Sequence, residues 1–264
     1  MTYEHILFEE RDGVATLRLN RPKSLNALHL DLVQELLHAL HHLPSQARAL
    51  LITGEGRAFC SGADLSAGAS ADKSQSAQEI DAGRFLETHL NPLLEKLLAL
   101  TIPVITAVNG AAAGAGCSLA LAGDIVIAAR SAYFLQAFVN IGLVPDVGST
   151  WLLPRLVGRA RAQAMMMLGE RVAADQALDW GMVYQVVEDP DLMTTASQLA
   201  LRLAHGPTVA YGLIRQGLRE CLDKTLTEAL TIERRNQRTA GLTRDFSEGV
   251  AAFTEKRPPV FQGR

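Results

Sequence analysis

Short apolar runs and longer stretches with helical spacing alternate along the first part of the chain. Ile6–Glu9 and Val14–Leu19 flank the turn Arg11-Asp12-Gly13, and together they predict a β-hairpin. Leucine and valine positions between residues 28 and 42 fall on one helical face, which predicts an amphipathic helix. Strands that alternate with helices favour an α/β core. Further apolar runs predict strands at Leu50–Thr53, Val104–Val108 and Ile125–Ala129.

The pattern changes after Trp151, where helical spacing dominates and one further strand is predicted at Val183–Val187. We interpret residues 1–200 as the core and residues 201–264 as a C-terminal helical region for packing or oligomerisation. A length of 264 residues suits one main domain, because single hydrophobic cores stop growing near ~250–300 residues. After the strand at Val183–Val187, helices are predicted at 192–204, 208–222, 225–240 and 246–254.

The composition is that of an ordinary globular protein, with 48% hydrophobic and 20% charged residues. A formal net charge of -3 gives no reason to expect nucleic acid or an anionic membrane as a partner. The three cysteines lie far apart without a CxxC pair, which argues against disulfides and favours a reducing, cytoplasmic location. The first 13 residues lack the apolar run of a secretory signal. Val104–Ala122 is apolar but rich in alanine and glycine, so we interpret it as buried core rather than a membrane span.

Two segments built of very small residues each follow a predicted strand. They are Arg57–Leu65 and Ala107–Ser118. Small residues let a ligand approach the backbone and leave N–H groups exposed at a turn or helix start. Two such loops can supply the pair of N–H donors that an oxyanion hole needs. For either loop alone, close packing of a strand against a helix is the favoured explanation of the composition.

The two small-residue segments occur together with Asn20–Leu28, Pro145–Thr150 and Phe253–Arg257. In this order the motifs resemble the crotonase superfamily, the enoyl-CoA hydratase/isomerase family, over essentially the whole chain. The resemblance implies an α/β fold, a crotonase-like spiral of ββα units with a C-terminal helical trimerisation region. It also implies an acyl-CoA thioester as substrate, no separate cofactor because coenzyme A is part of that substrate, and a homotrimer or dimer of trimers.

The same resemblance implies the site residues. The thioester oxygen would accept hydrogen bonds from the backbone N–H groups of Ala63 and Ala115, the second of which stands where the family usually has glycine. Phe253 and Lys256 would come from an adjacent subunit. The full set of implied substrate and CoA contacts is Lys23, Ala63, Asp64, Leu65, Gly114, Phe138, Phe253 and Lys256.

Two catalytic glutamates of the family's hydratases are missing from this chain. Their positions fall on Ser118 and Phe138. Hydration must position a water molecule and deliver a proton, which two carboxylates do and a hydroxyl and a phenyl ring cannot. The sequence therefore does not favour simple hydration.

Asp146 is the carboxylate that the chain has instead. Asp146 follows Pro145, so from sequence alone its presence is explained by a role as a turn residue. In the resemblance, however, it falls where family isomerases place an acid/base aspartate. The segment from Ile141 to Arg155 is most similar to the isomerases of bacterial phenylacetate degradation. This implies an acyl-CoA isomerase that shifts a double bond or isomerises a ring epoxide, and burial is expected to raise the pKa of Asp146.

Three rival functions stay open at this point. One is an enoyl-CoA hydratase with atypical catalytic groups. A second is a dienoyl-CoA isomerase, against which the absence of a carboxylate at Phe138 counts. A third, of another class, is a non-catalytic CoA-binding subunit.

Other patterns in the sequence are given simpler explanations. Gly114-Ala115-Gly116 lacks the third glycine of a dinucleotide fingerprint, because Leu119 stands there. His38, His41 and His42 have helical spacing without a carboxylate in register, so we interpret them as a solvated helix face and expect no metal site.

Overall fold

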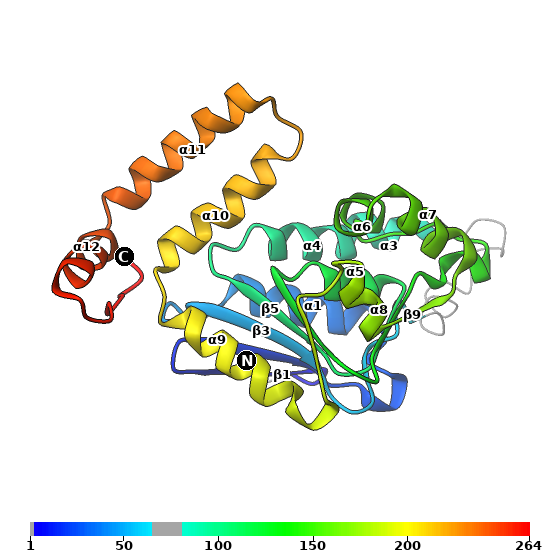
Figure 1. Ribbon diagram of the computed structural model, residues 1–264. Helices are drawn as coiled ribbons and strands as arrows, with labels where there is room; N and C mark the ends of the chain where they lie inside the picture. The colour runs from blue at the N-terminus through cyan, green and yellow to red at the C-terminus, as the bar shows by residue number, and fades with distance from the viewer. Residues whose placement is uncertain (1–2, 65–80) are drawn as a thin grey trace.

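The computed structural model describes residues 3–64 and 81–264, which form two β-sheets, the helices around them and a projecting helical arm (Figure 1). The larger sheet has the strand order β1-β2-β3-β5-β7-β10. β1 and β2 form the predicted hairpin, whose connecting Asp12 and Gly13 both have the positive φ that this tight turn requires. All other neighbours in this sheet are parallel. The strands are β1 (Ile6–Arg11), β2 (Val14–Leu19), β3 (Ala49–Gly54), β5 (Val104–Val108), β7 (Ile125–Ala129) and β10 (Gln185–Val187).

The smaller sheet has the order β4-β6-β8-β9, and its strands are three residues long. β4, β6 and β8 each follow a strand of the larger sheet closely, so the chain crosses from one sheet to the other after a tight turn. The crossing is close: a Cβ atom on Gly110 would clash with the carbonyl group of Arg57. The strand–strand–helix order confirms the predicted spiral of ββα units. These strands are β4 (Ala58–Cys60), β6 (Ala111–Ala113), β8 (Tyr133–Leu135) and β9 (Arg171–Ala173).

Helices enclose the sheets and bury the core. α9 (Leu192–Ala204) packs against β2, β3, β5 and β7, and its small residues Ala196, Ala200 and Ala204 let it lie close to the sheet (Figure 1). The other helices of the core region are η1 (Pro22–Ser24), α1 (Leu30–His41), α3 (Ala82–Phe85), η2 (Leu86–Leu90), α4 (Asn91–Leu98), α5 (Ala115–Leu121), η3 (Ala137–Ile141), α6 (Ser149–Val157), α7 (Arg159–Leu168), α8 (Ala174–Asp179) and η4 (Asp189–Asp191).

The alanine- and glycine-rich segment Val104–Ala122 is core, as predicted. It comprises β5, β6 and α5, and every residue of α5 is buried. Within the ranges given above, none of the helices has the combination of length and apolar character needed to cross a membrane.

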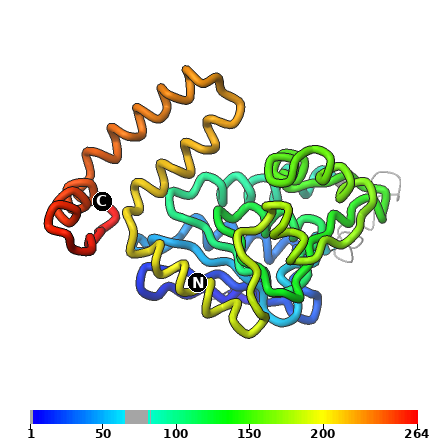
Figure 2. The backbone as a smooth tube through the Cα atoms, viewed as in Figure 1, coloured from blue at the N-terminus to red at the C-terminus, as the bar shows by residue number. Residues whose placement is uncertain are grey.

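The C-terminal helices project from the core as an arm (Figures 1 and 2). α10 (Thr208–Cys221) and α11 (Leu226–Gly241) contact each other along their lengths, and α12 (Arg244–Glu255) follows at the far end. Ile214, Leu218 and Leu222 are exposed on one face of α10 and its end. An apolar face of this kind in solvent is characteristic of an interaction surface.

Arg215 fixes the arm to the core. Its guanidinium is paired with Asp124 and donates hydrogen bonds to the carbonyl groups of Leu97 and Leu100 at the end of α4. The division predicted at residue 200 stays a prediction; α9 runs across that position, and the projecting helices begin at Thr208.

Candidate active site

Ala63 follows β4 in an extended segment beside Leu28. The N–H of Leu28 donates to the carbonyl of Gly62 at 2.7 Å, and the N–H of Asp64 donates to the carbonyl of Leu28 at 2.8 Å. In a parallel bridge of this pattern, the N–H of the central residue points to the opposite side. The N–H of Ala63 therefore faces away from Leu28, and the residue itself is exposed.

Ala115 is the first residue of α5, so its N–H has no acceptor within the helix. The preceding Gly114 has φ 52° and ψ -128°, a conformation that favours glycine. Gly62 lies against this turn: a Cβ atom on Gly62 would stand 3.5 Å from the backbone nitrogen of Ala115. The two small-residue segments are thus in contact, and the N–H groups predicted to act together belong to neighbouring backbone.

Phe138 covers the same turn. Its side chain is buried on η3, and a Cβ atom on Gly114 would lie 3.6 Å from the ring. An apolar ring thus occupies the position of one missing glutamate, directly beside the turn that carries Ala115.

Asp146 stands half-buried on the loop before α6, with its Oδ1 atom inside the protein. Its Oδ1 atom has no hydrogen-bond partner in the described part of the chain. Burial raises the pKa of this carboxyl to about 6, because the charged form loses solvation. A carboxyl with these properties can exchange a proton near neutral pH, which is what a general acid/base requires.

The backbone next to Asp146 is strained. Val147 and Gly148 have φ values of 46° and 72°, both in the left-handed region. For a β-branched residue this conformation is uncommon and costs about 1–3 kcal/mol. Val147 is nevertheless buried, so packing holds the turn in the conformation that presents Asp146.

Ser118, at the second missing glutamate position, holds the same loop. Its hydroxyl donates to the carbonyl of Asp146 at 3.2 Å and lies 2.5 Å from the Ser149 hydroxyl. The N–H of Ser149 donates to the same carbonyl at 2.9 Å. We call this arrangement of Ser118, Ser149 and the Asp146 carbonyl the serine clasp. Sequence reasoning assigned Ser118 no role beyond the absence of glutamate.

The remaining predicted residues lie around or away from this centre. Lys23 is exposed on η1, and Asp64 forms an ion pair with Arg21 at 3.0 Å. Leu65 lies outside the described residues. Phe253 and Lys256 lie at the end of α12, on the far side of the arm from α6 (Figure 1). Within one chain they are not brought to Asp146, so their role stays a prediction that requires an adjacent subunit.

Arg21 and Asn26 were not singled out from the sequence. Asn26 is fully buried; its side chain accepts from the N–H of Arg21 and donates to the carbonyls of Glu55 and Ala58. It therefore joins the Asn20–Leu28 motif to the β3–β4 turn and supports the position of Ala63. The signal that the sequence offered for Arg21 and Asn26 was that both lie in the Asn20–Leu28 motif.

The fold and this arrangement of backbone N–H groups beside a buried carboxyl define an enzyme of the acyl-thioester class. The family model for enoyl-CoA hydratase/isomerase matches residues 9–264, and the chain belongs to that family. It is 48% identical over 263 residues to 1,2-epoxyphenylacetyl-CoA isomerase of Escherichia coli (strain K12), covering 99% of each chain. It is 44% identical over the full length of both chains to a "Probable enoyl-CoA hydratase" of Rhodobacter capsulatus. The crystal structure of an enoyl-CoA hydratase from Bacillus anthracis superposes with a TM-score of 0.91 at 32% identity, covering 99% of this chain and 100% of that one.

Proposed function

We propose that this protein is an acyl-CoA isomerase whose catalytic acid/base is Asp146. The observation that carries the proposal is the Asp146 carboxyl, whose Oδ1 atom is buried and whose pKa is raised to about 6, on a loop that Ser118 holds. Ser118 and Phe138 stand where the hydratases' glutamates would be. The name of the E. coli relative supports a ring-epoxidised phenylacetyl-CoA as substrate.

The proposed mechanism combines an oxyanion hole with one proton carrier. The N–H groups of Ala63 and Ala115 donate to the thioester oxygen and stabilise the negative charge that develops there. For a 3-enoyl-CoA, Asp146 removes a proton from C2, the electron pair delocalises into the thioester, and the proton returns at C4. The double bond then lies between C2 and C3. No atom is added, so one carboxyl suffices. With a ring epoxide, the same group assists opening of the epoxide, and the isomeric oxepin thioester forms.

Phe138 and its apolar neighbours exclude water from the intermediate in this proposal. Coenzyme A enters as part of the substrate, with Lys23, Asp64, Leu65 and Gly114 among its contacts, and no other cofactor takes part. We place the enzyme in the cytoplasm.

We also propose that the protein is a homotrimer or a dimer of trimers. The support comes from the exposed apolar face of α10 and from a hollow of about 380 Å³ between α10 and α12, whose lining includes Phe246 and Phe253. In such an assembly Phe253 and Lys256 reach the substrate of the adjacent subunit.

A panel of three thioesters tests the function. Crotonyl-CoA, a 3-enoyl-CoA and ring-epoxidised phenylacetyl-CoA are supplied separately, and the products are identified by mass spectrometry. Isomerised products from the second and third, with little hydration of the first, are expected. Asp146→Asn should remove isomerisation by several orders of magnitude, whereas Asp179→Asn, at an exposed aspartate on α8, should not. Rapid hydration of crotonyl-CoA would instead favour the hydratase alternative, and a lack of turnover with all three would favour a CoA-binding subunit.

A further inference from the structure

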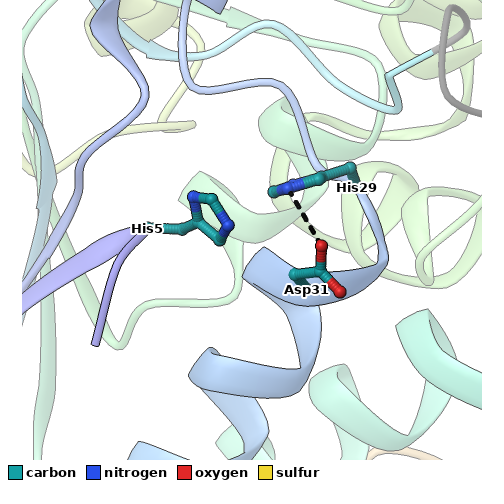
Figure 3. A group of neighbouring side chains, drawn as sticks. All are labelled: His5, His29 and Asp31. Carbon is teal, nitrogen blue, oxygen red and sulfur yellow. Dashed lines mark ion pairs between the residues drawn. The ribbon is translucent and has the colours of Figure 1, made fainter. Parts of the chain in front are cut away.

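Three potential metal ligands meet where the N-terminal strand approaches the start of α1. They are His5, His29 and Asp31, and one candidate ligand atom from each lies within 4.8 Å of the others (Figure 3). His5 precedes β1, whereas His29 and Asp31 begin α1, so the cluster joins two elements that are distant in sequence. None of the three belongs to the catalytic machinery proposed above.

The backbone around the cluster is fixed by hydrogen bonds that leave the side chains available. The N–H groups of Glu4, His5 and Ile6 all donate to the Glu35 carboxylate, at 2.8–3.1 Å, and this ties the start of β1 to α1. His29 is the N-cap residue of α1, but its imidazole makes no capping hydrogen bond. Both histidines are therefore placed by the backbone of the segments that carry them.

His29 is the central group of the cluster. Its Nε2 lies 3.8 Å from a carboxylate oxygen of Asp31, too long for a hydrogen bond, and its ring meets that of His5 edge-on at 4.5 Å (Figure 3). Its buried Nδ1 has no partner among residues 3–64 and 81–264. The side chain of His29 is only 15% exposed, and the ring nitrogen that faces Asp31 is Nε2.

The spacing suits a small ion. Bonds of roughly 2.0–2.2 Å join Zn²⁺ to imidazole nitrogen and carboxylate oxygen, so two ligands of one ion stand up to about 4 Å apart. The His29–Asp31 separation of 3.8 Å already falls in this range. The Asp31 side chain is 65% exposed and free to rotate toward the ion.

The local charges also permit a cation. Arg21 carries a positive charge near His29. The Arg21 guanidinium is itself paired with Asp64 at 3.0 Å. Asp31 supplies the negative charge, and its exposed side leaves room for a water ligand.

We propose that His5, His29 and Asp31 bind one divalent cation of the Zn²⁺, Co²⁺ or Ni²⁺ class, which pins the N-terminal strand to α1. Two imidazoles with one carboxylate favour these ions over Mg²⁺ and Ca²⁺, which take oxygen ligands. The site would stabilise the fold, because the separate ligands are brought together only in the folded chain.

Calorimetric titration of the full-length protein with Zn²⁺ alone tests the proposal. One ion per chain should bind, and the thermal unfolding midpoint should rise with Zn²⁺ concentration. His5→Gln and Asp31→Asn should each weaken binding by at least about tenfold. His41→Gln, at an exposed histidine on the same helix whose ring is hydrogen-bonded to Leu37, should bind as wild type.

Circular dichroism establishes that each variant is folded before titration. A Mg²⁺ titration run in parallel should show no comparable binding. The proposal is overturned if Zn²⁺ at millimolar concentration does not saturate a site, if His5→Gln and Asp31→Asn bind as tightly as wild type, or if Mg²⁺ binds more tightly than Zn²⁺.

Discussion

The buried carboxyl of Asp146 sets the pH range in which the proposed isomerase works. With a pKa raised to about 6 by burial, the group is mostly ionised above that pH and mostly protonated below it. We predict that kcat/KM falls as the pH is lowered through about 6, because only the carboxylate can remove the proton. A pH–rate profile measures this. An acid limb near 4, the ordinary range of an aspartate, would contradict the assignment.

The same pKa has a consequence for stability. The carboxyl has a higher pKa in the folded than in the unfolded state, so the folded protein binds this proton more tightly. The resulting contribution to the free energy of unfolding is complete below the unfolded pKa of 3.8 and is lost as the pH rises through about 6. A difference of about two pKa units corresponds to roughly 3 kcal/mol. We predict that Asp146→Asn raises the free energy of unfolding at pH 7.5 by up to about 3 kcal/mol and changes it much less at pH 4. Urea unfolding at both pH values measures the difference, and an equal effect at both would contradict the cause.

The serine clasp makes Ser118 a positioning residue. Ser118→Ala leaves the Asp146 carbonyl with one hydrogen bond fewer and Ser149 without its hydroxyl partner. Leaving one buried polar group without its hydrogen-bond partner costs about 1–3 kcal/mol of free energy. We therefore predict that kcat falls at least about tenfold while KM changes little. Ser45→Ala, at an exposed serine, is the matched control. An unchanged kcat in Ser118→Ala would remove the clasp from the mechanism.

At the scale of elements, most of the larger sheet was predictable because its strands are long enough to show apolar runs. The strands of the smaller sheet were not, since three residues carry no periodicity. β4 and β6 lie within the small-residue motifs that were interpreted only as loops. The helix predicted from residue 28 begins at Leu30, because Leu28 pairs with Ala63 instead. The sequence motifs identified the candidate site residues. The serine clasp could not be predicted, because it depends on a contact between residues that are 31 positions apart in the chain.

The attachment of α10 is an element-scale feature that can be tested. The Arg215 side chain is 8% exposed and holds Asp124 together with two carbonyl groups at the end of α4. We predict that Arg215→Ala lowers the free energy of unfolding by about 2 kcal/mol or more, because these acceptors lose their donor. Chemical denaturation measures the change. Arg202→Ala, at an exposed arginine on α9, should have little effect, and equal stability of the two variants would contradict the role of Arg215.

At the scale of the whole molecule, the arm carries a prediction about assembly. Ile214 and Leu218 are 56% and 69% exposed, an arrangement that favours burial against another copy. We predict that light scattering returns three or six times the chain mass. The double variant Ile214→Glu, Leu218→Glu should dissociate the assembly and lose turnover, since Phe253 and Lys256 would no longer reach a neighbouring site. Glu233→Gln on α11 is the control. A stable, active wild-type monomer would defeat both proposals.

The serine clasp also bears on how an isomerase and a hydratase of this family could interconvert during evolution. A glutamate placed at position 118 displaces the hydroxyl that holds the Asp146 loop, and alone it supplies only one of the two carboxylates that hydration needs. On the proposed mechanism, such a step slows isomerisation before hydration is gained. Changes at positions 118, 138 and 149 would have to accumulate together, which separates the two functions by a barrier in sequence space even though the folds coincide.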